Sequence, residues 1–266
     1  MMQMTNNFDL INGAFGPSRL PAARLRTMGL EAPQNRELTA RCEIVRNEGG
    51  LAELFIYGVV DSEVWWGDEV TSSQVITALA DLDGADVLVR INSPGGLVTE
   101  GMAIYNALVA HGGKVTTQVD GLAASIASVI LMAGDDRQAL GDGSFVMIHN
   151  AWGITWGDKR DAEAMRALLA KMDAAIVNVY GKGVAMDAAA LVSALDAETW
   201  FTASEAVEAG FVSNIVTDEA QDAVKARAQF DLKGFARAPK ALGGSAPDPA
   251  PVPDPAPAPS ASDAGP

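Results

Sequence analysis

Short runs of apolar residues alternate with longer amphipathic stretches along the middle of the chain. The apolar runs have the length and composition of buried strands, and they fall at 54–60, 87–92, 115–119, 138–140, 145–148 and 199–202. The stretches between them place apolar side chains three or four residues apart, which predicts helices at 72–81, 99–110, 159–182, 187–194 and 203–209. This alternation of strands and helices predicts an α/β fold with a mainly parallel sheet and right-handed crossovers.

The longest apolar run of the chain extends from Gly121 to Gly134 and contains Ser125. The run is too short to cross a bilayer, so we expect a buried helix that begins after a turn of small residues. Ser125 would then lie at a helix N-terminus, where free backbone N–H groups can hold an oxyanion. Taken alone, this serine is explained equally well as packing in a tight turn or as a nucleophile.

Composition divides the chain into three regions. Residues 1–37 are mixed in character and are expected to form an N-terminal arm or leader, whereas residues 38–217 carry the regular patterns of a single domain. Residues 218–266 form a C-terminal extension whose end is rich in Ala and Pro. Such a sequence buries too little apolar surface to fold, so we expect the tail to be disordered.

The charge balance and the missing motifs exclude several classes of partner. The net charge of −15 argues against binding to nucleic acid or to an anionic membrane surface. The single cysteine, Cys42, excludes an internal disulfide, and neither metal-ligand spacing nor a glycine-rich phosphate-binding signature is found, so no metal or cofactor is expected. Because the N-terminus lacks the pattern of a secretory signal, we expect a soluble, cytoplasmic protein.

The two histidines of the chain are the candidates for a general base that activates a serine. His111 lies at a predicted helix end, where an interaction with the helix dipole is the simpler explanation. His149 follows the predicted strand 145–148, and functional side chains of open α/β sheets lie at the carboxyl ends of strands. A histidine that only packs at such a place is about as common, so the residue by itself does not decide the question.

A glycine turn, Ser93-Pro94-Gly95-Gly96, follows the predicted strand 87–92. Consecutive glycines let the backbone approach a ligand closely and expose its N–H groups. An ordinary strand-to-helix turn explains the same residues, so this turn alone does not indicate a binding site.

Five short motifs occur in a fixed order along the chain. They are Ile91-Asn92-Ser93-Pro94-Gly95-Gly96, Gly101-Met102-Ala103-Ile104-Tyr105-Asn106, Gly121-Leu122-Ala123-Ala124-Ser125, Met147-Ile148-His149-Asn150 and Glu205-Ala206-Val207-Glu208-Ala209-Gly210. Together they resemble the proteolytic subunit of Clp protease, peptidase family S14, and its phage relatives. The resemblance covers roughly residues 50–216, and it implies that residues 38–217 form a Clp-like serine peptidase domain. The implied architecture is a Clp protease/crotonase-like fold of repeated strand–turn–helix units.

The resemblance also implies roles for particular residues. Ser125 matches the nucleophile of the family and His149 matches the general base. The oxyanion hole of the family consists of backbone N–H groups, and these match Gly96 and Ile126.

The acid of the family is usually an aspartate, and here the sequence departs from that pattern. The matching position, just before the strand 199–202, holds Glu198. A glutamate can orient an imidazole if its backbone lies slightly farther away. Asp196 is the competing candidate, and a solvated loop charge is the plain alternative for Glu198.

The implied activity is that of a serine endopeptidase that works through an acyl-enzyme. The glutamate, the N-terminal arm and the low-complexity tail resemble phage head maturation proteases, which implies capsid or scaffold proteins as substrates and a location in the cytoplasm or inside proheads. The alternative within the family is a cellular ATP-dependent Clp subunit that works with an unfoldase. An acyl-CoA enzyme of crotonase fold or an inactive scaffold protein are the alternatives of another class.

The family resemblance further implies a homo-oligomeric ring. The long predicted helix 159–182 is the expected contact element between rings. Trp65 and Trp66 are expected near a subunit contact or a substrate channel. Trp152 and Trp156 follow His149, and they are expected either to line a substrate groove or to pack.

Overall fold

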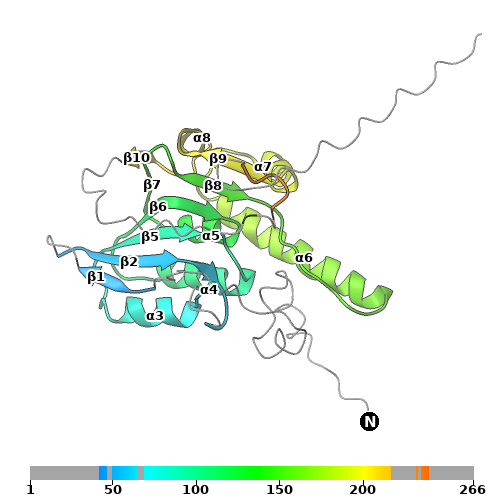
Figure 1. Ribbon diagram of the computed structural model, residues 1–266, viewed down its shortest axis with the longest axis horizontal. Helices are drawn as coiled ribbons and strands as arrows, with labels where there is room; N and C mark the ends of the chain where they lie inside the picture. Colours follow the sequence, from blue (N-terminus) through cyan, green and yellow to red (C-terminus); the bar gives the residue numbers. More distant parts are fainter. Residues whose placement is uncertain (1–41, 47–49, 65–68, 217–231, 233–234, 240–266) are drawn as a thin grey trace, which may run out of the picture.

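An eight-stranded, mainly parallel sheet runs through the described part of the chain (Figure 1). The computed structural model describes residues 42–46, 50–64, 69–216, 232 and 235–239. The expected N-terminal arm, most of the C-terminal extension and the Trp65-Trp66 pair therefore lie outside the described residues. The predicted α/β class with a mainly parallel sheet is confirmed.

The strands from the middle of the sequence also lie at the centre of the sheet. The order is β1-β2-β5-β6-β7-β10, with every pair parallel except β1 and β2. Strand β8 pairs in parallel with β6, and β9 pairs antiparallel with β8. A separate parallel pair joins β3 (Val59–Val60) and β4 (Glu69–Val70). The sheet strands are β1 (Ile44–Arg46), β2 (Ala52–Tyr57), β5 (Val87–Ser93), β6 (Val115–Ala124), β7 (Asp136–Leu140), β8 (Phe145–Ile148), β9 (Thr199–Thr202) and β10 (Asn214–Val216).

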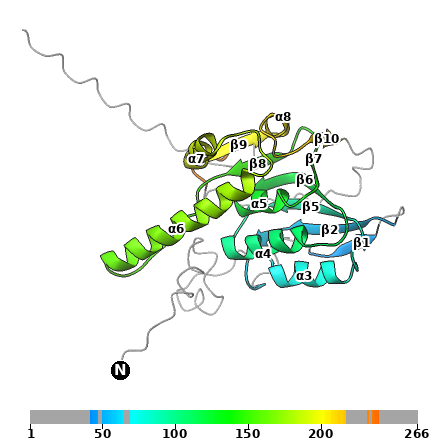
Figure 2. The same cartoon turned by 180° about the vertical axis from the view of Figure 1, so that it is seen from behind.

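Helices α3, α4 and α5 lie on one face of the sheet, while α6 extends away from it (Figures 1 and 2). Helices α3, α6 and α8 begin with a capping box, in which Thr71, Asp158 and Thr202 accept hydrogen bonds from the first helical turn. These caps fix where the helices start. The helices are α3 (Ser72–Ala80), α4 (Val98–Val109), α5 (Ile126–Leu131), α6 (Lys159–Tyr180), α7 (Ala188–Asp196) and α8 (Ala203–Glu208).

The main core lies between the central strands and the helices α4 and α5. Strand β5 is buried along almost its whole length, as a strand with both faces covered requires. All six residues of α5 are buried, which makes this short helix part of the core rather than its cover. The fully buried side chains include Leu54, Ile56, Ile91, Ile104, Leu108, Ile130 and Leu131.

Strand β6 changes its partner half-way along, and this change prepares the site. Its first half pairs with β7 through Thr116 to Val119, whereas its second half pairs with β8 through Leu122 to Ala124. Gly121 lies between the two halves, where a Cβ atom would stand 3.1 Å from the Asn92 amide oxygen. The sheet therefore divides at this point, and the end of β6 is directed toward β8.

The run from Gly121 to Gly134 was expected to be a turn of small residues followed by a buried helix, and the turn is wrong. Residues 121–124 belong to β6, whose Leu122 to Ala124 pair with β8, and the helix covers Ile126–Leu131. The predicted strand 54–60 is also interrupted, since Gly58 with φ 126° separates β2 from β3. Within the described residues, no helix combines the length and the apolar character needed to cross a membrane.

Candidate active site

Ser125 lies at the junction between β6 and α5 in a strained backbone conformation. Its φ and ψ are 55° and −129°, a region that costs a non-glycine residue about 1–3 kcal/mol. The strain is held in place by the hydrogen bond from the Ser125 amide to the Met147 carbonyl of β8, at 2.9 Å. A sharp turn of this kind between a strand and a helix presents the serine side chain at the carboxyl edge of the sheet.

His149 follows β8 directly, and the pairing of β8 with β6 brings it beside the serine. Its Nε2 atom lies 2.8 Å from the Ser125 hydroxyl oxygen. The two residues are 24 positions apart in the sequence, so neighbouring parallel strands rather than local structure create the contact. A serine hydroxyl within hydrogen-bond distance of an imidazole is the arrangement that general-base activation requires.

The surroundings of His149 favour a neutral imidazole. Burial lowers the pKa of His149 below its ordinary value, and the negative charge of Glu198 partly opposes this effect. A neutral imidazole can accept the serine proton, whereas an imidazolium cannot. The site is thus prepared for proton transfer at neutral pH.

The glycine turn after β5 packs against the serine junction. A Cβ atom on Gly95 would stand 2.7 Å from both the Ala124 carbonyl oxygen and the Ser125 Cβ atom, so only glycine fits there. Gly96 approaches Val60 so closely that a Cβ atom would lie 1.8 Å from the Val60 carbonyl oxygen. These contacts explain both glycines, and they place the Gly96 backbone next to the junction.

Two backbone N–H groups at this junction have no protein acceptor in the part of the chain that the structure describes. The bridge between Val60 and Gly96 uses the Gly95 carbonyl and the Leu97 amide, so the Gly96 N–H is directed away from Val60. The Ile126 N–H opens α5, where a helix has no acceptor of its own to offer. Two such donors beside a serine hydroxyl can hold the oxygen of a tetrahedral intermediate.

Glu198 and Asp196, the two candidates for the acid, lie in different environments. Asp196 accepts a hydrogen bond of 2.6 Å from the Asn150 side chain. The Glu198 carboxylate accepts hydrogen bonds from the Trp200 indole and from two backbone amides, and none from His149 among the described residues. The negative charge of Glu198 nevertheless acts on the imidazole, because it raises the pKa of His149. Its φ of 48° is a second strained position near the site.

A buried hydroxyl pair behind the serine was not predicted. The Ser128 hydroxyl donates to the Ser125 carbonyl at 2.5 Å, and it lies 2.7 Å from the Tyr180 hydroxyl at the end of α6. The Ser128 hydroxyl has only one proton, so Tyr180 is the donor in the second bond. The sequence signal was Ser128 itself, a polar residue inside an apolar run, but its tyrosine partner is 52 residues away.

The other reactive side chains of the described residues do not join this site. The His111 ring donates from Nε2 to the Ala85 carbonyl at 2.8 Å, near the amino end of β5. Ser125 and His149, by contrast, follow the carboxyl ends of their strands. Burial raises the pKa of the Cys42 thiol to about 11, so it stays protonated and unreactive. No group of three or more His, Cys, Asp or Glu side chains within the described ranges could hold a metal ion.

With this geometry in view, comparison with known proteins identifies the family. The family model described as Clp protease matches residues 53–219, which is more than half of the chain. The chain belongs to the Clp protease family. Membership makes it a serine-type peptidase, and the mixed α/β architecture agrees with the Clp protease fold.

Named relatives of this Clp protease are bacterial proteolytic subunits. The chain is 32% identical over 177 residues to ATP-dependent Clp protease proteolytic subunit 1 of Protochlamydia amoebophila, a match that covers 62% of this chain and 86% of the relative. It is 28% identical over 163 residues to subunit 2 of Tropheryma whipplei, covering 58% and 91% respectively. It is 31% identical over 172 residues to subunit 1 of Mycobacterium bovis, covering 63% and 84%.

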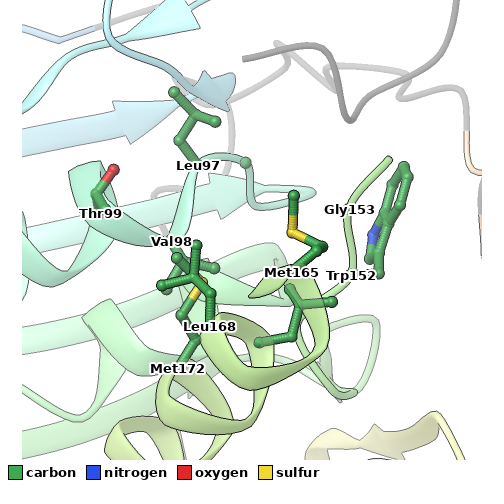
Figure 3. Close-up of a pocket in the computed structure, with 10 residues that line it drawn as sticks. Leu97, Val98, Thr99, Trp152, Gly153, Met165, Leu168 and Met172 are labelled. Atoms are coloured by element: carbon green, nitrogen blue, oxygen red, sulfur yellow. The ribbon is translucent and has the colours of Figure 1, made fainter. Parts of the chain in front are cut away.

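An apolar pocket opens beside the Gly96 turn of this Clp protease. Figure 3 shows side chains of α6 on one side of it and Leu97 and Val98 on the other. Trp152 stands at the outer rim and is 40% exposed, whereas Trp156 is 76% exposed and does not line the pocket. The expectation of a groove-lining tryptophan therefore fits Trp152 alone. The α6 residues that line the pocket are Met165, Leu168, Leu169 and Met172.

The depressed pKa of His149 predicts how the reactivity of Ser125 depends on pH. A base with a lowered pKa stays neutral to lower pH, so the rate of serine labelling by a fluorophosphonate probe should fall on acidification with a midpoint below 6.5, the ordinary value for histidine. The Glu198→Gln protein lacks the charge that raises this pKa, so its midpoint should lie lower still. A wild-type midpoint above 6.5, or an upward shift in Glu198→Gln, would contradict this account.

Proposed function

We propose that Ser125, His149 and Glu198 are the catalytic residues of a Clp-type serine endopeptidase. The observation that carries the proposal is the 2.8 Å contact between the His149 imidazole and the hydroxyl of a strained serine. Strain of this size persists only where the surrounding structure maintains it, and here it directs the hydroxyl toward the base. The neighbouring amides of Gly96 and Ile126 supply the oxyanion hole.

In the proposed reaction, His149 takes the hydroxyl proton as Ser125 attacks the peptide carbonyl carbon. The carbonyl oxygen becomes an oxyanion and accepts hydrogen bonds from the two free amides, a contribution worth about 3 kcal/mol per donor in comparable sites. The imidazolium then gives its proton to the departing amine, which leaves an ester on Ser125. Water attacks this ester with His149 again as base, and the acid product and free serine are released. The charge of Glu198 stabilises the imidazolium in both steps.

The apolar pocket supports a preference for apolar residues next to the cleaved bond. It shares the Gly96 backbone with the proposed oxyanion hole, so a side chain adjacent to the reacting carbonyl reaches it. Its lining of leucine, valine and methionine offers no charged partner. Methionines adapt to different apolar shapes, which suits cleavage of many sequences rather than one.

We further propose that the subunit acts on proteins within a homo-oligomer. Helix α6 extends from the core, and the side chains of its first two thirds are exposed or only half-buried (Figure 2). The relatives are named as proteolytic subunits of ATP-dependent proteases, which supports a role beside an ATP-driven unfoldase. The head maturation role, with capsid or scaffold proteins as substrates, is the second proposal and rests on the glutamate in the acid position.

The catalytic proposal predicts a complete loss of reaction in Ser125→Ala. The wild-type protein should be labelled by a fluorophosphonate probe at one residue, located by peptide mass mapping as Ser125, and should cleave casein. Ser125→Ala should show neither, with cleavage reduced by at least about 10³-fold. Ser213→Ala, which changes an exposed serine away from the site, provides the matched control. Labelling that persists in Ser125→Ala would overturn the proposal.

Filling the pocket should slow the cleavage of peptides with a large side chain before the cleaved bond more than that of peptides with a small one. In Leu168→Trp, kcat/KM for a peptide with leucine before the cleaved bond should fall about tenfold more than for the same peptide with alanine, because the indole occupies the space of the larger side chain. Ala167→Trp places the same indole at an exposed neighbouring position of α6 and should not discriminate between the peptides. Equal effects of both variants would exclude the pocket as the binding site of that side chain.

The two biological roles predict different partners. An ATP-dependent role predicts that an added AAA+ unfoldase accelerates degradation of a folded substrate, and that the acceleration requires ATP. A head maturation role predicts defined cleavage of a coexpressed capsid or scaffold protein without ATP. Gel analysis of both reactions, with Ser125→Ala as the control, separates them, and failure of either reaction removes that role.

A further inference from the structure

We infer that a C-terminal strap, residue 232 together with residues 235–239, completes the acid side of the active site and positions Glu198 against His149. The inference rests on the proposed function, because it assigns the strap to the same catalytic residues. The strap belongs to the C-terminal extension, residues 218–266, for which the sequence predicted no role in the site. Its backbone amides and one phenylalanine ring make the decisive contacts.

The strap binds the carboxylate of Glu198 through its backbone. The Arg237 amide donates to Oε1 at 2.6 Å, and the Ala236 amide donates to Oε2 at 2.9 Å. The Trp200 indole adds a third hydrogen bond, at 3.2 Å to Oε1. Each carboxylate oxygen is thus held by an amide of the strap, and hydrogen bonds to a charged acceptor are among the stronger ones in proteins.

The strap also covers the imidazole. The ring of Phe235 meets the His149 ring edge-to-face, with centroids 5.6 Å apart, and meets the Trp200 ring in the same way at 5.8 Å. Phe235 is therefore in contact with both the base and a residue that bonds the acid. An apolar ring in this place contributes to the burial that lowers the pKa of His149.

Buried side chains of the strap anchor it independently of these polar contacts. Leu232 and Ala238 are 3% and 2% exposed, and they join a small apolar cluster with Leu122, Ala124 and Met147. Leu122 and Ala124 lie in the end of β6 that leads to the serine, and the Met147 carbonyl accepts the Ser125 amide. The strap thus packs on the same strand ends that carry the nucleophile and the base.

In other serine peptidases the acid orients the imidazole through a direct hydrogen bond. Here the strap holds the acid in place instead. Among the described residues Glu198 accepts no hydrogen bond from His149, so its influence depends on where its charge is held. The strap fixes that charge and, through Phe235, limits water around the ring. Glu198 is the charged group that raises the pKa of His149. The carboxylates of Asp173 and Asp196 accept hydrogen bonds from the Ala151 amide and the Asn150 side chain.

The first test removes one amide while keeping the rest of the strap. Arg237→Pro lacks the N–H that bonds Glu198, whereas Arg237→Ala keeps it and loses only the exposed side chain. The second-order rate of fluorophosphonate labelling at pH 7 should be at least about tenfold lower in Arg237→Pro than in Arg237→Ala, as expected when a catalytic group is displaced. If Arg237→Pro does not fold by circular dichroism, Trp200→Phe removes another donor to the same oxygen and should slow labelling in the same direction.

The second test measures the pKa of His149, which would not change if the strap had a purely structural role. Phe235→Ala exposes the imidazole to water, so the pKa of His149 should rise, and the acidic midpoint of the labelling profile should move to higher pH. Phe235→Leu keeps an apolar cover and should restore most of the wild-type midpoint. Thermal unfolding of all variants shows whether a rate loss is only a loss of folded protein.

The outcomes separate this inference from the proposed function. Labelling of the wild type at Ser125, with slower labelling of Arg237→Pro and a raised midpoint in Phe235→Ala, supports both. If the wild type is labelled at Ser125, but Arg237→Pro is labelled as fast as Arg237→Ala and the midpoint of Phe235→Ala does not rise, the strap is overturned as a positioning element and the catalytic proposal stands. Absence of labelling at Ser125 in the wild type overturns the catalytic proposal, and the strap inference with it.

Discussion

The pairing of the end of β6 with β8 is the interaction on which the rest of the site depends. Three residue pairs join the strands, and the Ser125 amide extends the ladder by donating to the Met147 carbonyl. This pairing brings two sequence segments side by side, so that the residue after each strand faces the other. Without the change of partner at Gly121, β6 would continue along β7, and the serine would end far from the histidine.

The strained conformation of Ser125 is stabilised from three directions. The β8 carbonyl holds its amide, the Ser128 hydroxyl holds its carbonyl, and the Gly95 backbone fills the space beside its Cβ atom. The helix that follows is buried throughout, and burial of its apolar side chains offsets a strain of a few kcal/mol. The polar residues of the site are therefore supported by a buried apolar helix, which explains the long apolar run around the serine.

Much of this could be predicted from the sequence, and the exceptions have physical causes. Regular periodicity located the main strands and helices, and the ordered motifs brought together Ser125, His149 and the glycine turn. The segment from Gly121 to Ala124 was expected to be a turn because its small residues carry no periodic signal, and only its pairing with β8 makes it a strand. The short edge strands β1 and β10 carry too few residues for a periodic signal. The contacts of Glu198 with residues 236 and 237 span nearly forty positions, and backbone amides leave no trace in the sequence pattern.

The hydroxyl chain from Tyr180 through Ser128 to the Ser125 carbonyl has a consequence for communication across the molecule. Tyr180 is the last residue of α6, the helix that reaches farthest from the sheet. The inner end of this helix and the serine backbone are therefore joined by two consecutive hydrogen bonds. If a displacement of α6 alters these two bonds, thermodynamic reciprocity requires that a ligand bound at the serine acts back on the position of the helix to the same extent.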